Sequence, residues 1–334
     1  MVSAQDDLRP ERLGFLLVPY FATMSYASAI EPFRAANILS GRTLYSWRHV
    51  AVEDLRVEAS TGLSFEADHA IGEAEDYDGL VVCAAGNPST FDHEPTFAWL
   101  RRLARRGTWL AGVSGGPFVL ASAGLLDGYR CTIHWEHAPA FAEAFAQPRL
   151  TSSIYEIDRG RLTCAGGISA LDMMHAVIAK THGGELAAAV SEWFLQSHVR
   201  TGATAQLMTR FERFGLPSVA LSNVIQAIEE NVEHPLPRER LAELAGVSIR
   251  QLERLFEKQM KTTVDRYYLT IRLHHAQRLL RQTRLSVAEI GIASGFASAS
   301  YFSRAYKSRY GHGPRDERSL NFLQGKPVDR TESL

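Results

Sequence analysis

Short apolar runs alternate with amphipathic segments over the first two hundred residues of this 334-residue chain. The runs at 13–18, 79–85 and 108–113 are almost wholly apolar, which is typical of strands buried on both faces. The segments 25–39 and 94–106 repeat their apolar residues at helical spacing. Strands and helices that alternate in this way predict an α/β fold, with a mostly parallel sheet covered by helices on both faces.

Further elements continue this pattern to about residue 200. Two short strand-like segments surround a glycine-containing turn, and two helical segments follow them. We therefore predict an α/β domain over residues 9–200, completed by a strand at 47–52, a hairpin at 153–157 and 161–164, and helices at 168–181 and 185–199.

Two similar units follow one another in the C-terminal part of the chain, which carries no strand pattern. Each unit has a short helix, a turn with a glycine and a longer helix, and such a tight turn needs the backbone freedom of glycine. The helices are predicted at 241–245 and 249–260 in the first unit, and at 290–293 and 298–309 in the second.

A long helix predicted at 264–282 connects the two units and is expected to hold them apart rigidly. Apolar residues spaced four apart predict the buried face of each longer helix. They are Leu252 with Phe256, and Phe302 with Tyr306. The expected division is an all-α domain at 218–320, preceded by a linker at 201–217 and followed by a tail at 321–334.

Charge is distributed unequally between the two parts of the chain. The whole chain has a net charge of −1, with 36 Lys and Arg against 37 Asp and Glu. Residues 236–318 alone hold 16 Lys and Arg against 8 Asp and Glu, so the rest of the chain is acidic. A basic helical block points to nucleic acid as its partner, and the alternative from charge alone is a solvated basic surface.

A helix-turn-helix unit places its second helix in the major groove, and two such helices read segments of DNA about 34 Å apart. The duplicated unit therefore predicts double-stranded DNA as the partner, with an ordinary helical bundle as the alternative. The residues expected to bind DNA lie on the two longer helices or at their starts: Ser248, Arg250, Gln251, Arg254, Lys258, Ser298, Ser300, Ser303, Arg304 and Lys307.

At these residues the C-terminal block resembles the AraC/XylS family of transcription regulators. The likeness covers about 218–320 and is carried by LAELAGVSIRQLERLFEKQM, by IRLHHAQRLLRQT at 271–283 and by SVAEIGIASGFASASYFSRAYKSRYGHGP. Gly291 and Ser294 depart from the residues common in the family. The resemblance implies an activator that contacts promoter DNA with both units and has RNA polymerase as a further partner.

Residues 108–126 (TWLAGVSGGPFVLASAGLL) predict a strand, a glycine-rich turn and a helix that begins near Pro117. A nucleophile elbow has this order, with its reactive residue in the turn and backbone N–H groups that hold an anion. Ser114 occupies the turn, although AGVSGG is one position out of register with GxSxG. The alternative role for this serine is an ordinary helix cap.

The first part of the chain resembles the ThiJ/PfpI type of glutamine-amidotransferase-like domain. With the C-terminal likeness, the order of domains is similar to that of GlxA-type regulators, which join this domain to an AraC-type DNA-binding domain. The strings that carry the likeness are AIEPFRAAN at 29–37, YDGLVVCAAG at 77–86, SGGPFVLASAGLLDG at 114–128, TIHW at 132–135 and AGGISALDMMHAV at 165–177.

Enzymes of this type have a cysteine where Ser114 stands, and an acidic residue that our alignment places at Ser25. A thiolate suits the reaction because a helix N-terminus lowers its pKa. His134 is a candidate base, but the sequence shows no carboxylate to orient it. The likeness therefore implies a sensor and not an enzyme. A Ser-dependent amidase or hydrolase with a DNA-binding tail is one alternative, and a constitutive DNA-binding protein whose α/β domain only dimerises is the other.

The sensor domain is expected to bind a small inducer. Turn amides suit a carboxylate, and aromatic rings attract a cation by about 0.5–2 kcal/mol. A small amino acid or a quaternary amine such as betaine or carnitine carries both groups. The predicted ligand residues are Phe21, Tyr26, Glu31, Asn87, Ser114, Gly115, Gly116, His134 and Trp135, while Asp172 is expected to stabilise the dipole of its helix.

Other features exclude several classes of protein. Cys83, Cys131 and Cys164 form no CxxC pair, so we expect no disulfide scaffold, no metal and no cofactor. No apolar stretch approaches the roughly 20 residues that span a bilayer, and Asp6 and Asp7 stand where a signal peptide is basic. We expect a cytoplasmic homodimer without a membrane partner.

Overall fold

The computed structural model describes residues 9–74, 76–206 and 219–317. The chain divides into two compact units, residues 1–206 and 207–334, each with hydrophobic cores of its own. Residues 201–206 of the expected linker pack with the first unit, whereas residues 207–217 and the expected tail lie outside the described residues.

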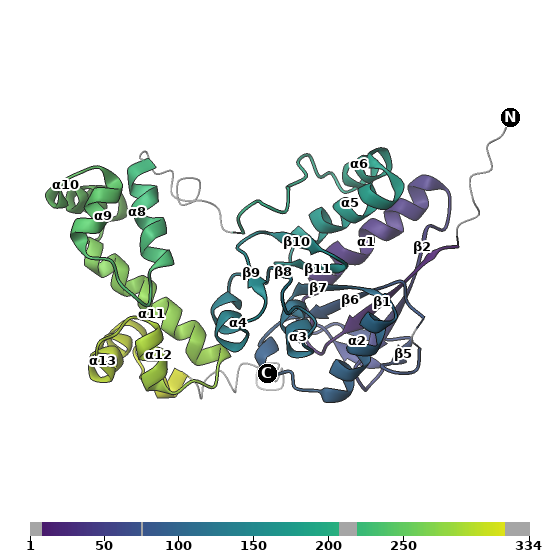
Figure 1. The fold of residues 1–334 in the computed structure, drawn as a ribbon, viewed down its shortest axis with the longest axis horizontal. Coiled ribbons are helices and arrows are strands. Elements are labelled where there is room, and N and C mark those ends of the chain that lie inside the picture. The colour runs from purple at the N-terminus through teal and green to yellow at the C-terminus, as the bar shows by residue number, and fades with distance from the viewer. Residues whose placement is uncertain (1–8, 75, 207–218, 318–334) are drawn as a thin grey trace, which may run out of the picture. The chain divides into compact units, whose positions relative to one another are not determined.

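The first unit is built on a seven-stranded sheet with the order β10-β11-β7-β6-β1-β2-β5 (Figure 1). Neighbouring strands are parallel except β10, which is antiparallel to β11. In chain order the elements are β1 (Glu11–Leu17), α1 (Thr23–Ser40), β2 (Tyr45–Ala51), β3 (Arg56–Glu58), β4 (Ser64–Glu66), β5 (His69–Ala70), β6 (Gly79–Ala84), a 3-10 turn (Pro88–Thr90), α2 (Glu94–Arg105), β7 (Trp109–Ser114), α3 (Gly116–Ser122), β8 (Arg130–Cys131), α4 (Ala138–Ala144), β9 (Arg149–Leu150), β10 (Tyr155–Asp158), β11 (Arg161–Cys164), α5 (Ser169–His182) and α6 (Gly184–Trp193).

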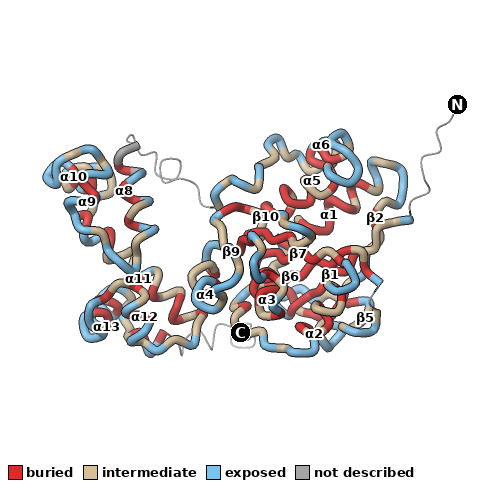
Figure 2. The backbone as a smooth tube through the Cα atoms, in the orientation of Figure 1, coloured by how far each residue is buried: buried red, intermediate tan, exposed pale blue. Residues whose placement is uncertain are grey.

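Helices cover both faces of this sheet because successive strand residues point into two different cores. Phe15 and Val113 belong to the core under α1, α5 and α6, while Leu16 and Leu110 belong to the core under α2, α3 and α4. Figure 2 shows the central strands as largely buried, with most of the exposed residues on loops and on the outer sides of the helices. The predicted α/β fold with a mostly parallel, doubly covered sheet is confirmed.

Two parts of the first unit differ from the sequence-based expectation. The helix predicted at 185–199 ends at Trp193, because Gln196 and Arg200 turn back to bind the carboxylate of Asp172. Strands β3, β4, β5, β8 and β9 and helix α4 were not predicted, since such short elements establish no period in the sequence.

The second unit is helical throughout residues 219–317. The long helix α11 has the predicted bounds, and the helix predicted at 249–260 is an α-helix followed by one π-helical turn. The elements are α8 (Val219–Glu230), α9 (Arg238–Ala245), α10 (Ile249–Leu255), the π turn (Phe256–Met260), α11 (Val264–Gln282), α12 (Val287–Ala293) and α13 (Ala299–Tyr310).

Helix α11 takes part in two separate cores. Tyr268 in its first half packs with α8, α9 and α10, whereas Leu280 in its second half packs with α12 and α13. The predicted buried faces are confirmed, because Leu252, Phe256, Phe302 and Tyr306 are each at most 1% exposed. Each helix-turn-helix unit is therefore stabilised by its own half of the connecting helix.

Two glycines of the second unit differ in what surrounds them. Gly295 has a φ of +74°, and a Cβ atom there would lie 2.5 Å from the carbonyl oxygen of Val232. A Cβ atom on Gly291, within α12, would lie 3.4 Å from the ring of Phe302, which is an ordinary contact. Glycine is thus required at the turn but not in the helix before it.

We expect Gly295→Ala to lower the free energy of unfolding by about 1–3 kcal/mol, through backbone strain. Gly291→Ala is its matched control and should raise stability by about 0.5–1 kcal/mol, because alanine is the better helix former. Urea unfolding followed by circular dichroism measures both changes. A stability change of the same sign in the two variants would contradict the placement of this turn.

Candidate functional site

Ser114 ends β7 at the carboxyl edge of the parallel sheet. Its φ of +59° lies in the left-handed region, which residues other than glycine seldom adopt and which is a mark of functional turns. Helix α3 starts very close to β6, since a Cβ atom on Gly116 would lie 2.2 Å from the carbonyl oxygen of Val82. The predicted order of strand, tight turn and helix is confirmed.

This turn offers fewer N–H groups to an anion than the sequence suggests. The N–H of Gly115 donates to a backbone oxygen of β6 at 2.9 Å, the N–H of Ser114 faces the sulfur of Cys164, and Pro117 has no N–H. Within the described residues, Gly116 carries the turn N–H that makes no hydrogen bond. A bound carboxylate would therefore also need side-chain donors.

The hydroxyls of Ser25 and Ser114 provide such donors at one place. A Cβ atom on Gly166 would lie 2.7 Å from Cβ of Ser114 and 2.8 Å from Oγ of Ser25, so both serines border the same glycine. Oγ of Ser25 accepts a hydrogen bond from the N–H of Gly167 at 2.7 Å. Both hydroxyls therefore lie beside the loop that precedes α5.

The cysteines of this unit supply no surface nucleophile at the turn. Cys164 is fully buried, and burial raises the pKa of its thiol to about 11 although the N–H groups of Gly166 and Ser114 oppose this shift. Burial also raises the pKa of the Cys83 thiol. Both thiols are therefore protonated and packed in the core.

His134 and Trp135 reach the same edge of the sheet. The N–H of Thr132 donates to Oγ1 of Thr163 at 2.9 Å, so the chain follows β11 toward its carboxyl end. Burial lowers the pKa of His134, and its Nδ1 accepts a hydrogen bond from the N–H of Glu136 at 3.3 Å. In the part of the chain that the structure describes, no carboxylate hydrogen-bonds to this ring.

The aromatic residues predicted to meet a cation differ in exposure. The rings of Phe21 and Tyr26 are buried, with centroids 5.4 Å apart, and both pack against Phe65. Trp135 is 40% exposed, and its ring lies 5.4 Å from that of His134. Phe21 and Tyr26 are therefore packed in the core, and Trp135 is the most exposed of the three rings.

The sequence also singled out Asn87, Glu31 and Asp172, and the structure places them at different points. Asn87 lies in the loop after β6, whose Pro88 would be 3.1 Å from a Cβ atom on Gly115. Glu31 lies six residues after Ser25, about 9 Å further along α1, and pairs with Arg34, so the structure does not bring it to the turn. Asp172 lies in the first turn of α5, as its expected role at the helix dipole requires, and it is also fully buried and bound by Arg200.

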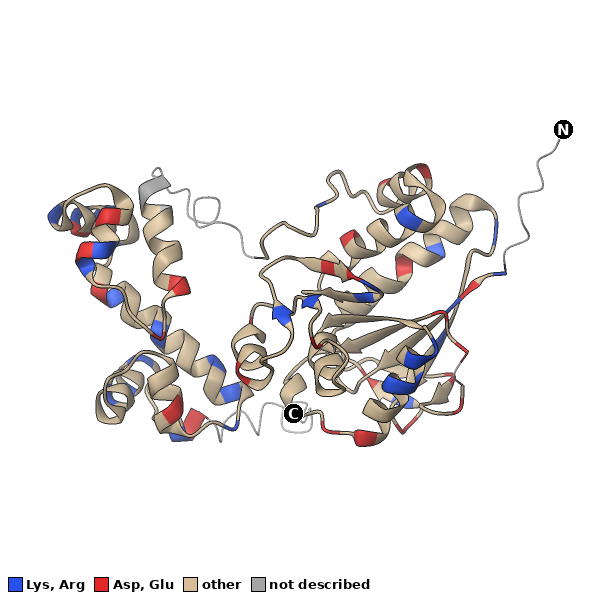
Figure 3. Cartoon of the chain, viewed as in Figure 1, with Lys and Arg blue, Asp and Glu red and all other residues tan. Residues whose placement is uncertain are grey.

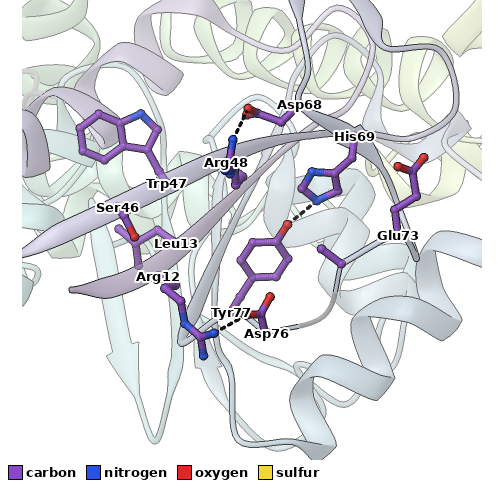
Figure 4. A pocket seen from close by; sticks show the side chains of 11 residues that line it. Arg12, Leu13, Ser46, Trp47, Arg48, Asp68, His69, Glu73, Asp76 and Tyr77 are labelled. Atoms are coloured by element: carbon purple, nitrogen blue, oxygen red, sulfur yellow. Dashed lines mark hydrogen bonds and ion pairs between the residues drawn. The ribbon is translucent and has the colours of Figure 1, made fainter. Parts of the chain in front are cut away.

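A separate hollow of about 620 Å³ lies at the amino end of β1 and β2 (Figure 4). Its charged residues pair with each other: Arg12 with Asp76, and Arg48 with Asp68 at 3.0 Å. Trp47 also lines it. Ser114 lies at the opposite, carboxyl edge of the sheet, and no motif in the sequence pointed to this hollow.

The residues predicted to bind DNA lie at the surface of the second unit. Ser248 caps α10 by a reciprocal capping box with Gln251, and Ser298 caps α13 by accepting a hydrogen bond from the N–H of Tyr301. Figure 3 shows Lys and Arg along these helices. Ser303 is half-buried, and the exposed members of the predicted set are Ser248, Arg250, Gln251, Arg254, Lys258, Ser298, Ser300, Arg304 and Lys307.

Helix α13 is held in place by the buried carboxylate of Glu317, which was not predicted from the sequence. Glu317 is 2% exposed and accepts hydrogen bonds from Tyr306 at 2.8 Å and from Arg281 at 2.6 Å, and it pairs with His312 at 2.6 Å. Burial alone would raise the pKa of Glu317, but these bonds outweigh it and lower the pKa to about 2.

Comparisons with known proteins agree with this two-part architecture. Residues 15–180 match the model of the DJ-1/PfpI family, and residues 241–319 match that of a helix-turn-helix domain. Among solved structures, that of an AraC family transcriptional regulator from Pseudomonas putida is similar, with a TM-score of 0.52 and 28% identity, over 55% of this chain and 100% of that one. A DJ-1/PfpI unit followed by an AraC-type helix-turn-helix domain defines a DNA-binding transcription regulator.

Two relatives match almost the whole chain. The HTH-type transcriptional regulator GlxA of Rhizobium meliloti (strain 1021) is 45% identical over 315 residues, which are 94% of this chain and 97% of that protein. The HTH-type transcriptional regulator CdhR of Pseudomonas aeruginosa is 41% identical over 306 residues, 92% of this chain and 91% of its own. The chain therefore belongs to this family of AraC-type regulators with a DJ-1/PfpI domain.

None of the helices in the described residues combines the length and the apolarity that a bilayer span requires. Among the same residues, no group of three or more His, Cys, Asp or Glu side chains is arranged to hold a metal ion.

We expect Glu317→Gln to destabilise the second unit by about 1.5–3 kcal/mol at pH 7, because hydrogen bonds to a charged group are lost. The folded-state pKa of Glu317 lies below its ordinary value of 4.5. Its stabilisation is therefore complete above that value and is lost as the pH falls toward 2. Thermal unfolding between pH 3 and pH 7 should show the gap to wild type narrowing in acid, whereas the exposed Glu257→Gln should match wild type throughout. A gap that does not depend on pH would contradict this role.

Proposed function

We propose that this regulator activates transcription from its target promoters when a small metabolite binds beside Ser114. The observation that supports this most directly is a nucleophile turn whose expected thiol and acid are both serines, in a chain that also carries two DNA-binding helices. The expected partners are promoter DNA, RNA polymerase and a second copy of the chain, in the cytoplasm.

The chemistry of the site favours a zwitterionic ligand. The hydroxyls of Ser25 and Ser114 and the N–H of Gly116 are hydrogen-bond donors for a carboxylate. Because burial lowers the pKa of His134, its ring is neutral near pH 7 and does not repel a cation. With the exposed ring of Trp135 beside it, this edge suits an amino acid or a quaternary amine such as betaine or carnitine.

A Ser-dependent hydrolase is the less favoured alternative. Such chemistry needs a base within hydrogen-bond reach of the serine and a third group to orient that base. His134 lacks an orienting carboxylate among the described residues, and the relatives are named as transcriptional regulators, although the DJ-1/PfpI fold also includes enzymes. We propose that the protein performs no turnover.

We place the end of the sensor domain at residue 206 instead of 200. Ser153 and Ala205 form an antiparallel bridge, and the N–H of Gln206 donates to the oxygen of Ser152 at 3.2 Å. The linker is then the segment 207–217, and the DNA-binding domain begins at about residue 218 as the sequence predicts.

Arg254→Ala and Arg304→Ala should each weaken binding to an operator selected from random DNA by about 1–3 kcal/mol, since each removes an exposed cation from a helix expected in the major groove. Arg105→Ala, on the surface of α2, is the matched control and should bind like wild type. Fluorescence anisotropy at one fixed salt concentration measures all three. Unchanged affinity in the Arg254→Ala/Arg304→Ala double variant would refute the two-helix interface.

Glycine betaine, carnitine and free amino acids form the screen for the inducer, with the rise in melting temperature as the readout. For the compound that binds, Trp135→Ala should reduce affinity about 2- to 30-fold, the range expected for one cation–π contact. Trp47→Ala, in the separate hollow, should leave affinity unchanged. A loss of affinity in Trp47→Ala but not in Trp135→Ala would show that the ligand binds in that hollow. Amide hydrolysis that disappears in Ser114→Ala would establish the hydrolase instead.

A further inference from the structure

The segment after α6 leaves its helix to bind a single buried carboxylate. Leu195 has a φ of +55° and is 91% exposed, which is unusual for a leucine and marks a strained departure from the helix. Oδ2 of Asp172 accepts hydrogen bonds from Nε of Arg200 at 2.9 Å and from Nη2 at 2.6 Å. Oδ1 accepts from the N–H of Arg200 at 2.9 Å and from Nε2 of Gln196 at 2.8 Å.

Asp172 is closely connected to the candidate ligand site. It is the fourth residue of α5, and the loop directly before that helix contains Gly166 and Gly167. Gly166 borders Ser114 and Ser25, and the N–H of Gly167 donates to the hydroxyl of Ser25. One helical turn therefore separates the ligand edge from the ion pair.

A second attachment joins the end of the same segment to the other side of the site. Nε2 of Gln206 donates to the oxygen of Ile133 at 2.8 Å, to Oγ1 of Thr132 at 2.9 Å and to the oxygen of Ser153 at 3.0 Å. Ile133 directly precedes His134. Gln206 is also the last residue of the first unit, so this attachment ends where the chain continues toward the DNA-binding unit.

Each attachment contains a glutamine whose side-chain amide is only partly hydrogen-bonded. The amide oxygens of Gln196 and Gln206 are both buried without a hydrogen-bond partner among the described residues. Unpaired buried polar atoms are uncommon in native structures and are a source of strain. Asp172, in contrast, is 0% exposed and needs Arg200, because a lone buried carboxylate is strongly unfavourable. The segment is thus held by a strong ion pair and by glutamine amides that are only partly hydrogen-bonded. Such unequal contacts suit a segment that changes between two arrangements.

We propose that residues 196–206 form a coupling segment, which carries the state of the ligand site to the DNA-binding unit through the Asp172–Arg200 pair and the Gln206 attachment. This inference rests on the proposed function. A ligand held beside Gly166 and His134 touches the residues next to both attachments, and so favours one arrangement of the segment. By linkage, DNA binding must then alter both attachments even when no ligand is present.

That reciprocity allows a test with DNA alone. The probe is a DNA duplex that the full-length wild-type chain selects from a pool of random sequences. Amide hydrogen exchange of the protein is then measured in the presence and in the absence of this duplex. We expect DNA to change exchange about fivefold or more at 132–134, 166–172 and 196–206, in line with a typical coupling. Exchange that changes only within 219–317 would overturn the inference while leaving DNA binding intact. If wild type enriches no duplex, the proposed function fails and the inference fails with it.

Two variants separate the attachments. Asp172→Asn/Arg200→Gln removes both charges together, so no lone charge stays buried, and should abolish the DNA-induced change at 166–172. Gln206→Ala keeps the buried ion pair and so protects the fold, and should abolish the change at 132–134. Glu94→Gln/Arg101→Gln removes an ion pair on α2 and should respond like wild type. A wild-type response in both coupling variants would overturn the inference.

Discussion

The close approach of Gly116 to the backbone of β6 is the constraint on which the N-terminal site depends. No side chain fits between this residue and the carbonyl oxygen of Val82, so α3 begins directly against the sheet. Two residues before Gly116, Ser114 adopts a left-handed conformation, and Gly166 of the loop before α5 lies against it. At this turn the chain presents the hydroxyl groups of Ser114 and Ser25, both beside Gly166.

Much of this architecture follows from sequence patterns, because long periodic segments and glycine-rich turns have direct physical causes. The buried strands, α11 and the paired helix-turn-helix units are of this kind. Asp172 and Glu317 could not be interpreted in the same way, since their partners Arg200 and Arg281 are brought to them only by tertiary packing. The end of α6 was mispredicted for that reason: its helical sequence continues, but Asp172 draws the chain away from the helix.

The candidate ligand residues show a similar division. Ser114, Asn87 and His134 were predicted as ligand residues; in the structure Ser114 ends β7, Asn87 follows β6, and Thr132 before His134 bonds Thr163 of β11. A sequence does not show which amide is already paired or which ring is covered. The N–H of Gly115 and the faces of Phe21 and Tyr26 are occupied by other parts of the fold. The hydrogen-bond donors for a carboxylate therefore lie on two serines and Gly116, fewer backbone groups than the turn alone suggests.

Helix α11 has 19 residues, a rise of about 28 Å, and its two halves belong to different cores. Residues that share no core and lie this far apart contribute to free energies almost independently. Mutations that change the surface of one helix-turn-helix unit therefore leave the packing of the other unit unchanged. Under the proposed two-helix interface, the two halves of an operator can then diverge one at a time during evolution, so that a regulator acquires new promoters by stepwise change in a single half-site.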